Sequence, residues 1–274
     1  MNIQWYPGHM TKTRRMMEES ISLVDVVIEL IDARIPYSSK NPDIDNLAKN
    51  KYRIIVMNKS DLADEKATSA WVKYFEDKGF KVLLTDALAG KGVNAVTAAA
   101  KELMAEKIAR LKAKGRIFVP VRSMIVGIPN VGKSTFINKY VGKVTAKTGD
   151  KPGVTRGKQW IRIKKDFELL DTPGILWPKF EDEQVGLKLA FTGAINDDIL
   201  DIETMACEFI NLMVATYPDR LRLHSVPFHS SPFLSIPFHF IPFHSIPLHS
   251  TRFDSTPSHC ITFHFIPLWL IPFR

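Results

Sequence analysis

MIVGIPNVGKS, residues 124–134, is the stretch that decides the fold. It opens with an apolar run of strand character and continues from Gly127 to Gly132-Lys133-Ser134, which matches the pattern GxxxxGK[ST]. Residues 133–141 then have a helical pattern. A glycine-rich turn between a strand and a helix lets backbone N–H groups surround a phosphate, and the helix N-terminus adds partial positive charge. The stretch therefore predicts a phosphate-binding loop.

The same loop offers side chains for a nucleotide and its metal ion. Lys133 is expected to reach the outer phosphates, and Ser134 is expected to bind Mg²⁺. Further phosphate contacts are expected from Asn130, Val131, Gly132 and Thr135. These residues indicate a nucleotide without specifying its base.

The surrounding sequence alternates between strand-like and helix-like segments. Short apolar runs predict strands at residues 26–31, 54–57, 81–84 and 124–126. Helical patterns lie at 65–77, 93–114 and 133–141, and later at 185–194 and 202–215. Residues 161–163 and 168–170 predict a hairpin. This alternation predicts an α/β fold with a doubly wound, mostly parallel sheet.

A second motif, Asn58-Lys59-Ser60-Asp61, follows the strand at 54–57 and indicates which base is bound. The Asp61 carboxylate can accept two hydrogen bonds from guanine N1–H and the N2 amino group, a pattern that adenine cannot satisfy. Asn58 is expected to brace the loop, and the Lys59 stem is expected to cover the base. Farther on, the Ala87 N–H is expected to face guanine O6, although Asp86 stands where serine is usual. Together with the phosphate-binding loop, the motif predicts GTP and GDP as ligands.

The third motif is Asp171-Thr172-Pro173-Gly174, at the end of the predicted hairpin. Asp171 is expected to hold Mg²⁺ through water, and the Gly174 N–H to sense the γ-phosphate. Thr155, between the phosphate-binding loop and this motif, is the candidate switch threonine for the Mg²⁺ shell. The alternative interpretation is that Thr155 is an ordinary loop residue without a role in metal binding.

The guanine motifs precede the phosphate-binding loop, whereas ordinary GTPases have them last, so the chain is circularly permuted. It resembles the circularly permuted GTPases of the ribosome biogenesis GTPase A family. The resemblance covers residues 1 to about 221 and rests on this order and on three runs, namely residues 5–10, 32–36 and 171–195. It implies a GTPase that binds the large ribosomal subunit, reads its rRNA and promotes a late assembly step. The family's C-terminal helical RNA-binding domain is expected to begin near residue 178 and to be cut off at 221.

The catalytic group for hydrolysis is not obvious from the motifs. Ile175 stands where many GTPases have a glutamine that orients water, which predicts slow intrinsic hydrolysis. His9, the only histidine outside the C-terminal repeat, is a candidate to orient water once the N-terminal arm moves inward. The alternative is that His9 packs or contacts RNA. Asn130 is a candidate potassium ligand.

Composition indicates an anionic partner. The chain has 37 Lys and Arg against 29 Asp and Glu, a formal net charge of +8, which favours RNA, DNA or an anionic membrane surface. Lys12, Arg14 and Arg15 beside Trp5 and Tyr6 suit RNA contact, or form a solvated helix face. For the basic amphipathic segment 101–116 a structural role is favoured.

The remaining properties point to a reducing compartment. The two cysteines are not paired in sequence, and neither a signal peptide nor an apolar run of membrane-spanning length is present. We expect a cytoplasmic monomer that does not bind a membrane. Two other functions stay open: a switch that regulates a protein effector, and an inactive truncated product.

The C-terminal segment differs abruptly from the rest. The composition changes at residue 223, proline recurs every fifth residue from Pro227 to Pro247, and seven of the eight histidines lie in this segment. Such proline spacing gives no framework to converge imidazoles on a metal, which argues against a metal site. The pentamer TTCCA in tandem encodes Phe-His-Ser-Ile-Pro, so the tail is interpreted as a translated repeat. The predicted domains are an N-terminal basic arm (1–22), the GTPase domain (23–177), a truncated helical RNA-binding domain (178–221) and a repeat-derived tail (222–274).

Overall fold

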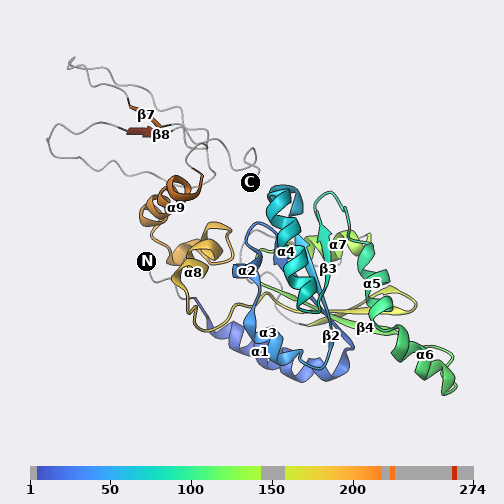
Figure 1. Cartoon of the computed structure of the whole chain (residues 1–274). Helices are drawn as coiled ribbons and strands as arrows, with labels where there is room; N and C mark the ends of the chain where they lie inside the picture. The colour runs from blue at the N-terminus through green and yellow to red at the C-terminus, as the bar shows by residue number, and fades with distance from the viewer. Residues whose placement is uncertain (1–4, 143–157, 218–222, 226–260, 264–274) are drawn as a thin grey trace, which may run out of the picture. The chain divides into compact units, whose positions relative to one another are not determined.

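Six strands form the sheet at the centre of the first of two units in this chain (Figure 1). The computed structural model describes residues 5–142, 158–217, 223–225 and 261–263. The first unit comprises Met1–Phe209 with Leu268–Arg274, and the second comprises Ile210–Pro267. The boundaries proposed at residues 22, 177 and 221 stay predictions.

The sheet has the strand order β3-β2-β1-β4-β6-β5. All neighbours are parallel except β5 and β6, which form an antiparallel hairpin. The strands are β1 (Val26–Asp32), β2 (Tyr52–Asn58), β3 (Lys81–Thr85), β4 (Val121–Gly127), β5 (Gln159–Lys164) and β6 (Phe167–Asp171). The predicted α/β fold with a mostly parallel sheet is confirmed.

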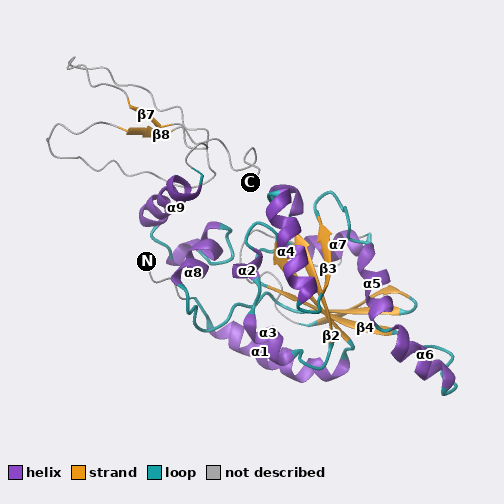
Figure 2. Cartoon of the chain, viewed as in Figure 1, coloured by secondary structure: helices purple, strands orange, loops and turns teal. Residues whose placement is uncertain are grey.

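Alternate residues of the strands pack against helices on opposite faces, which makes the sheet doubly wound (Figure 2). In β2, Ile54 and Val56 belong to the larger hydrophobic cluster, together with Val96 of α5. Ile55 and Met57 belong to the smaller cluster, which contains Phe75 of α4. Because side chains alternate along a strand, continuous apolar runs such as these indicate a sheet covered on both faces.

The helices mostly follow the predicted ranges. Those of the first half are α1 (Gly8–Ser20), η1 (Ile21–Leu23), α2 (Pro36–Ser39), α3 (Pro42–Leu47), η2 (Ser60–Leu62) and α4 (Glu65–Asp77). The others are α5 (Ala95–Leu103), α6 (Ala105–Ala113), α7 (Lys133–Val141), α8 (Glu183–Phe191), η3 (Asp197–Ile199) and α9 (Ile202–Thr216). Asp64 caps α4 by accepting from the Ala67 N–H, which explains why that boundary was predictable.

The predicted helix at 93–114 is instead two helices, α5 and α6, with the fully buried Met104 between them. α5 buries four residues against the sheet, whereas α6 buries none. Segment 101–116 contains the end of α5 and all of α6. The favoured structural role is supported for the first half of α6, where Ile108 packs against the larger hydrophobic cluster and Lys107 pairs with Asp25, and not for the second half.

Most of the C-terminal repeat lies outside the described residues. Two short strands of the repeat are described, β7 (Leu223–Ser225) and β8 (Ile261–Phe263). They pair antiparallel, and the sequence did not predict this pairing. Neither strand contains proline, so each retains its backbone donors. No helix in the described ranges is long and apolar enough to cross a membrane.

Candidate functional site

The phosphate-binding loop occupies the turn between β4 and α7. Gly132 has φ +93° and is the N-cap residue of α7, and Asn130 is left-handed at φ +56°. A Cβ on Gly132 would lie 2.5 Å from Asn58 Nδ2, so this position has room only for glycine. The sequence therefore forms the loop locally through glycine and closes it against the guanine motif.

The lysine and the aspartate expected to act on the phosphates and on Mg²⁺ lie together. Lys133 Nζ is 2.5 Å from Asp171 Oδ1, and both side chains are buried. Asp171 ends β6, next to Ile125 of β4, and the Thr172 hydroxyl donates to the Ile125 carbonyl at 2.8 Å. Ser134 and Thr135 begin α7 and are half-buried. This end of the site therefore holds a buried ion pair, and Ser134 and Thr135 lie in the first turn of the helix that carries Lys133.

The DTPG segment lies directly against the phosphate-binding loop. A Cβ on Gly174 would lie 2.9 Å from Pro129 Cα, and the Ile175 N–H donates to the Gly127 carbonyl at 3.1 Å. Ile175 itself is 2% exposed, so its side chain belongs to the core. The Asn41 amide donates to the Ile175 carbonyl at 3.3 Å. The backbone that is expected to sense the γ-phosphate is thus held from two sides.

Asn58 joins the guanine motif to both neighbouring loops. Its Nδ2 donates to the Val131 carbonyl at 2.9 Å, and its Oδ1 accepts from the Thr85 hydroxyl at 3.1 Å and the Ala87 N–H at 3.0 Å. The expected brace is present. The Ala87 N–H, however, was expected to face guanine O6, and here it donates to Asn58, so it can serve a base only as a shared donor.

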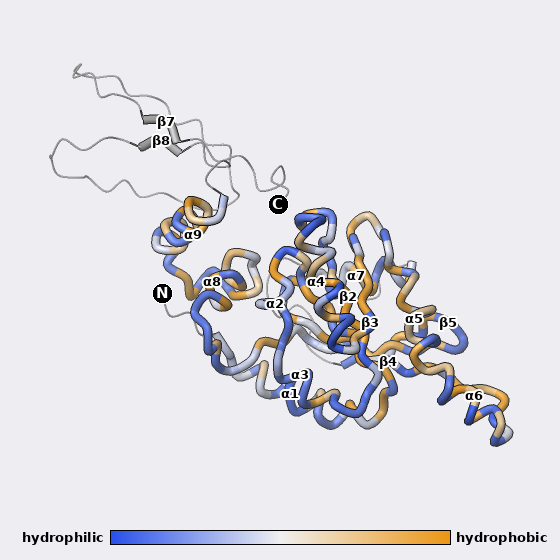
Figure 3. Tube along the Cα trace, viewed as in Figure 1, coloured by the Kyte–Doolittle hydropathy of each residue, from blue (hydrophilic) through white to orange (hydrophobic). Residues whose placement is uncertain are grey.

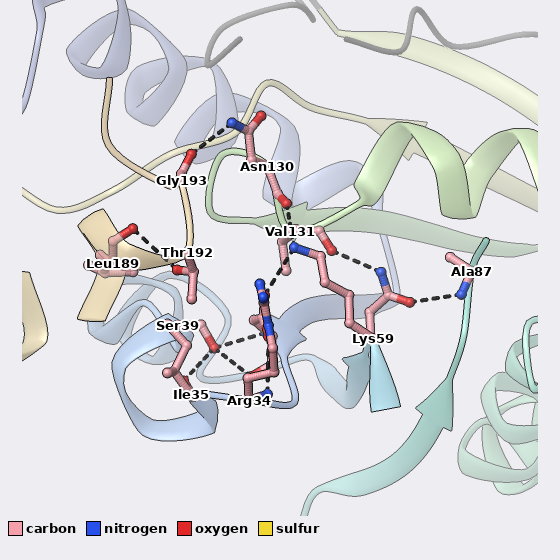
Figure 4. A network of polar contacts seen from close by, with 12 residues as sticks. Arg34, Ile35, Ser39, Lys59, Ala87, Asn130, Val131, Leu189, Thr192 and Gly193 are labelled. Atoms are coloured by element: carbon pink, nitrogen blue, oxygen red, sulfur yellow. Dashed lines mark hydrogen bonds and ion pairs between the residues drawn. The ribbon is translucent and has the colours of Figure 1, made fainter. Parts of the chain in front are cut away.

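Lys59 and Asp61 occupy the edge of the site. Lys59 is left-handed at φ 60°, and its Nζ donates to the Asn130 carbonyl at 3.0 Å and lies 3.0 Å from Asp32 Oδ2. Asp61, in η2, is exposed, as a carboxylate that meets a base must be. The lysine stem therefore runs between the guanine motif and the phosphate-binding loop (Figure 4).

Asp32 and Arg34 belong to the site, although the sequence motifs assigned them no role of their own. Arg34 Nε and Nη2 donate to the two Asp32 carboxylate oxygens at 2.9 and 2.7 Å. Burial raises the pKa of Asp32, but hydrogen bonds from Arg34 and the charge of Lys59 outweigh it, so the pKa lies below its ordinary value. The sequence carried a signal for this pair: Asp32 is the last residue of β1, beside Asn58 of β2, and Arg34 follows two residues later.

A second pair that the sequence motifs did not identify is Glu29 of β1 with Arg53 of β2. Glu29 is 1% exposed and pairs with Arg53 at 2.7 Å, and it also accepts from the Asn41 N–H at 3.1 Å. Burial raises the pKa of Glu29, while Lys40 and Arg53 act in the opposite direction. Since Asn41 holds the Ile175 carbonyl, this buried pair supports the DTPG backbone.

Asn130 reaches out of the loop toward the segment after α8. Its Nδ2 donates to the Gly193 carbonyl at 2.7 Å, and Gly193 has φ +73° (Figure 4). No sequence pattern signalled this contact, because the two residues belong to separate motifs. It links the phosphate-binding loop to the start of the predicted helical domain.

Two predicted site residues are not brought into this arrangement. His9 is exposed at the start of α1, and in the described part of the chain its contacts are with Trp5, whose ring centroid is 6.4 Å away, and Thr13. Thr155 lies outside the described residues. Arg14 pairs with Glu18 at 3.2 Å and Asp43 at 3.0 Å, so part of the N-terminal basic cluster has a structural role.

Comparisons with known proteins agree with this geometry. Residues 122–215 match the family described as "50S ribosome-binding GTPase". The ribosome biogenesis GTPase A of Bacillus cereus is 53% identical over 231 residues, covering 83% of this chain and 78% of its own. That of Priestia megaterium is 53% identical over 233 residues, covering 83% and 81%. GNP-bound YlqF from Thermotoga maritima aligns with a TM-score of 0.54 at 28% identity, covering 76% of each chain. This chain therefore belongs to the ribosome biogenesis GTPase A family.

Proposed function

We propose that this chain binds and hydrolyses GTP as a switch in assembly of the large ribosomal subunit, with rRNA as its partner. The observation that carries the proposal is Asn58, which is 2% exposed and bonds the guanine motif to Thr85, Ala87 and Val131. A single buried amide thus joins the loop for the base to the loop for the phosphates. Family membership and the net charge of +8 support the ribosomal partner.

The chain's own residues fit a magnesium-bound triphosphate. Ser134 would bind Mg²⁺ through its hydroxyl and Asp171 through a water molecule, so that all these ligands are the oxygens that Mg²⁺ prefers, and Lys133 would supply a cation for the outer phosphates. When bound, Mg²⁺ neutralises charge on the phosphates during transfer. The Gly174 backbone, held against Pro129, would register the presence of the γ-phosphate.

Base specificity is tested by Asp61→Ala. Because only a carboxylate here pairs with both guanine donors, the variant should lose the preference for GTP over ATP in competition with a fluorescent nucleotide. Asp64→Ala, a change at the nearby helix cap, should retain that preference. A preference unchanged in Asp61→Ala would refute the site.

The group that orients water is proposed to be His9. The buried Ile175 cannot do so, and His9 is exposed on an N-terminal helix that can meet RNA. His9→Ala should keep its slow basal turnover and lose most of the stimulation by large ribosomal subunits. Equal stimulation in His9→Ala and wild type would leave His9 with only a packing or RNA contact.

Thr155 and potassium complete the proposed site. Thr155 is proposed as the switch threonine, so Thr155→Ala should weaken Mg²⁺-dependent binding of a GTP analogue more than binding of GDP.

Asn130 is proposed as a potassium ligand. Its bond to Gly193 fixes the orientation of the side-chain amide, and amide oxygens are suitable ligands for K⁺. Equal turnover in K⁺ and Na⁺ would refute this role.

Subunit binding is tested by sedimentation of the full chain with large ribosomal subunits in GTP analogue, GDP or no nucleotide. Cosedimentation should be strongest with the analogue and should weaken steeply with salt. If protein effectors, and not rRNA-containing particles, stimulated turnover, the chain would be a signalling switch. We further propose that the chain acts in the cytoplasm as a monomer. Light scattering of the purified chain would test the monomeric state.

A further inference from the structure

α6 and the turn after it, residues 105–118, form a segment that we name the basic arm. In Figure 1 the arm extends away from the sheet. None of the residues of α6 is buried, although the preceding Met104 is fully buried. At its end Ile117 is 98% exposed and Phe118 is 56% exposed. The arm thus presents charged and apolar side chains to solvent together. In Figure 3 the trace of the arm shows hydrophilic and hydrophobic residues close to one another.

The base of the arm is fixed to the sheet. Ile108 packs against the larger hydrophobic cluster, and Lys107 Nζ lies 2.5 Å from Asp25 Oδ1, just before β1. These contacts involve only the first half of α6. The second half therefore projects from an anchored base.

The end of the arm has a defined backbone geometry. Gly115 has φ +86°, its N–H donates to the Lys112 carbonyl at 2.9 Å, and the Arg116 N–H donates to the Leu111 carbonyl at 3.1 Å. These two bonds form a Schellman motif, which usually carries an apolar side chain where Arg116 stands. Arg116 occupies the position whose apolar side chain normally packs against the last turn of the helix. That hydrophobic contact is therefore missing, and the next residue, Ile117, is exposed to solvent.

Charge in the arm has one sign beyond its base. Between Lys107 and Phe118 there is no Asp or Glu, and the four basic residues are all exposed: Arg110, Lys112, Lys114 and Arg116. Cations near a helix C-terminus stabilise the helix by about 0.3–1 kcal/mol each, which accounts for Arg110 and Lys112. That effect explains neither Arg116 beyond the helix nor an exposed Phe118.

We propose that the basic arm docks on a single-stranded region of rRNA, with its cations on phosphates and Phe118 stacked on an unpaired base. This inference rests on the ribosomal function proposed above. The side chains of the arm favour RNA as the partner. Phosphates would pair with its uninterrupted series of basic residues, and an unpaired base offers a flat face on which the exposed ring of Phe118 can stack. None of the hydrogen bonds and ion pairs described above for the nucleotide site involves residues 105–118, so binding by the arm can be tested without altering nucleotide contacts.

The test uses the full chain and purified large-subunit rRNA over a range of salt concentrations. The variant Arg110→Gln/Lys112→Gln/Lys114→Gln retains helix-forming residues and all contacts of Gly115. Its log affinity should fall less steeply with log salt, by about 2 in slope, because about 0.7 is lost per phosphate contact. The matched control Lys49→Gln/Lys66→Gln/Lys73→Gln removes the same charge from exposed positions elsewhere and should retain most of the wild-type slope.

Phe118 is tested separately. Phe118→Ala should weaken binding roughly 5- to 100-fold with an unchanged salt slope, as expected for a stacked base, and Phe118→Trp should restore it. Basal GTP turnover without RNA should be the same in all these variants.

The outcomes distinguish the two proposals. Equal losses in the arm and control variants would overturn the arm as an RNA site while leaving the GTPase function intact. Loss of binding to whole subunits with unchanged binding to naked rRNA would also overturn it, and would identify a protein surface as the occupant. If the wild type bound neither rRNA nor subunits and its turnover were insensitive to both, the ribosomal function would fail and the arm proposal with it.

Discussion

The phosphate-binding loop and the basic arm both combine a left-handed glycine with positive charge, yet they treat that charge in opposite ways. Lys133 is 6% exposed and paired with Asp171, and Gly132 lies against Asn58. In the arm, the cations are exposed, and a Cβ on Gly115 would meet nothing within 4 Å. A buried charge acts through fixed geometry, whereas an exposed charge acts through a field that salt screens. Substitutions in the two regions should therefore affect different measurements.

The largest expected effect comes from Gly132→Ala. A left-handed alanine whose Cβ collides with Asn58 Nδ2 should lower nucleotide affinity on the order of 100-fold, measured with a fluorescent GTP analogue. Gly115→Ala has the same backbone strain in open space, so it should cost about 1 kcal/mol of stability and leave nucleotide affinity unchanged. Equal losses of nucleotide affinity in the two variants would contradict the claim that the surroundings of Gly132, and not its backbone conformation alone, determine the effect.

Asn58→Ala should have the next largest effect. It leaves the Thr85 hydroxyl, the Ala87 N–H and the Val131 carbonyl without their partner, which should cost about 3 kcal/mol in the free energy of unfolding by urea. Asn50→Ala, at an exposed position, should change that free energy by less than about 0.5 kcal/mol. A small loss in Asn58→Ala would show that the three loops are held by other contacts.

Asp32→Asn tests a buried charge through pH. The folded pKa of Asp32 is lowered, so its stabilisation is present above the unfolded value of about 3.9 and is lost as pH falls through the folded pKa. The variant should be about 3 kcal/mol less stable at pH 7, since Arg34 and Lys59 lose their partner. This difference should shrink in urea unfolding below about pH 4. A difference independent of pH would contradict the assignment.

The smallest effect on stability is expected from the arm variant Arg110→Gln/Lys112→Gln/Lys114→Gln. Exposed cations near a helix end contribute less than about 1 kcal/mol each at low salt. Thermal unfolding should therefore differ slightly from wild type at low salt and not at all in high salt. A large loss that persisted in high salt would mean that these side chains pack.

Much of the fold could be predicted from the sequence because its signals are local. The ranges 65–77 and 133–141 match α4 and α7, where Asp64 and Gly132 begin the helices. The break at Met104 could not be predicted, because no glycine or proline marks it and tertiary burial decides it. The exposure of α6 was missed for the same reason: its amphipathic pattern does not reveal whether a partner covers it.

The site divides in the same way. Motif spacing identified Asn58, Lys133 and Asp171, which the structure places in one connected region. The use of the Ala87 N–H by Asn58 and the Asn130 contact with Gly193 depend on how separate loops approach each other. Such contacts leave no mark in the linear order of residues.

The bond from Asn130 to the Gly193 carbonyl has a consequence for hydration. It closes the chain between residues 130 and 193 into a ring that contains DTPG and the second half of the phosphate-binding loop, from Asn130 to Ser134. If nucleotide exchange draws the Asn130 amide away, the Gly193 carbonyl needs a water molecule in its place. Hydration of the Gly193 carbonyl, in the turn after α8, would then depend on which nucleotide is bound.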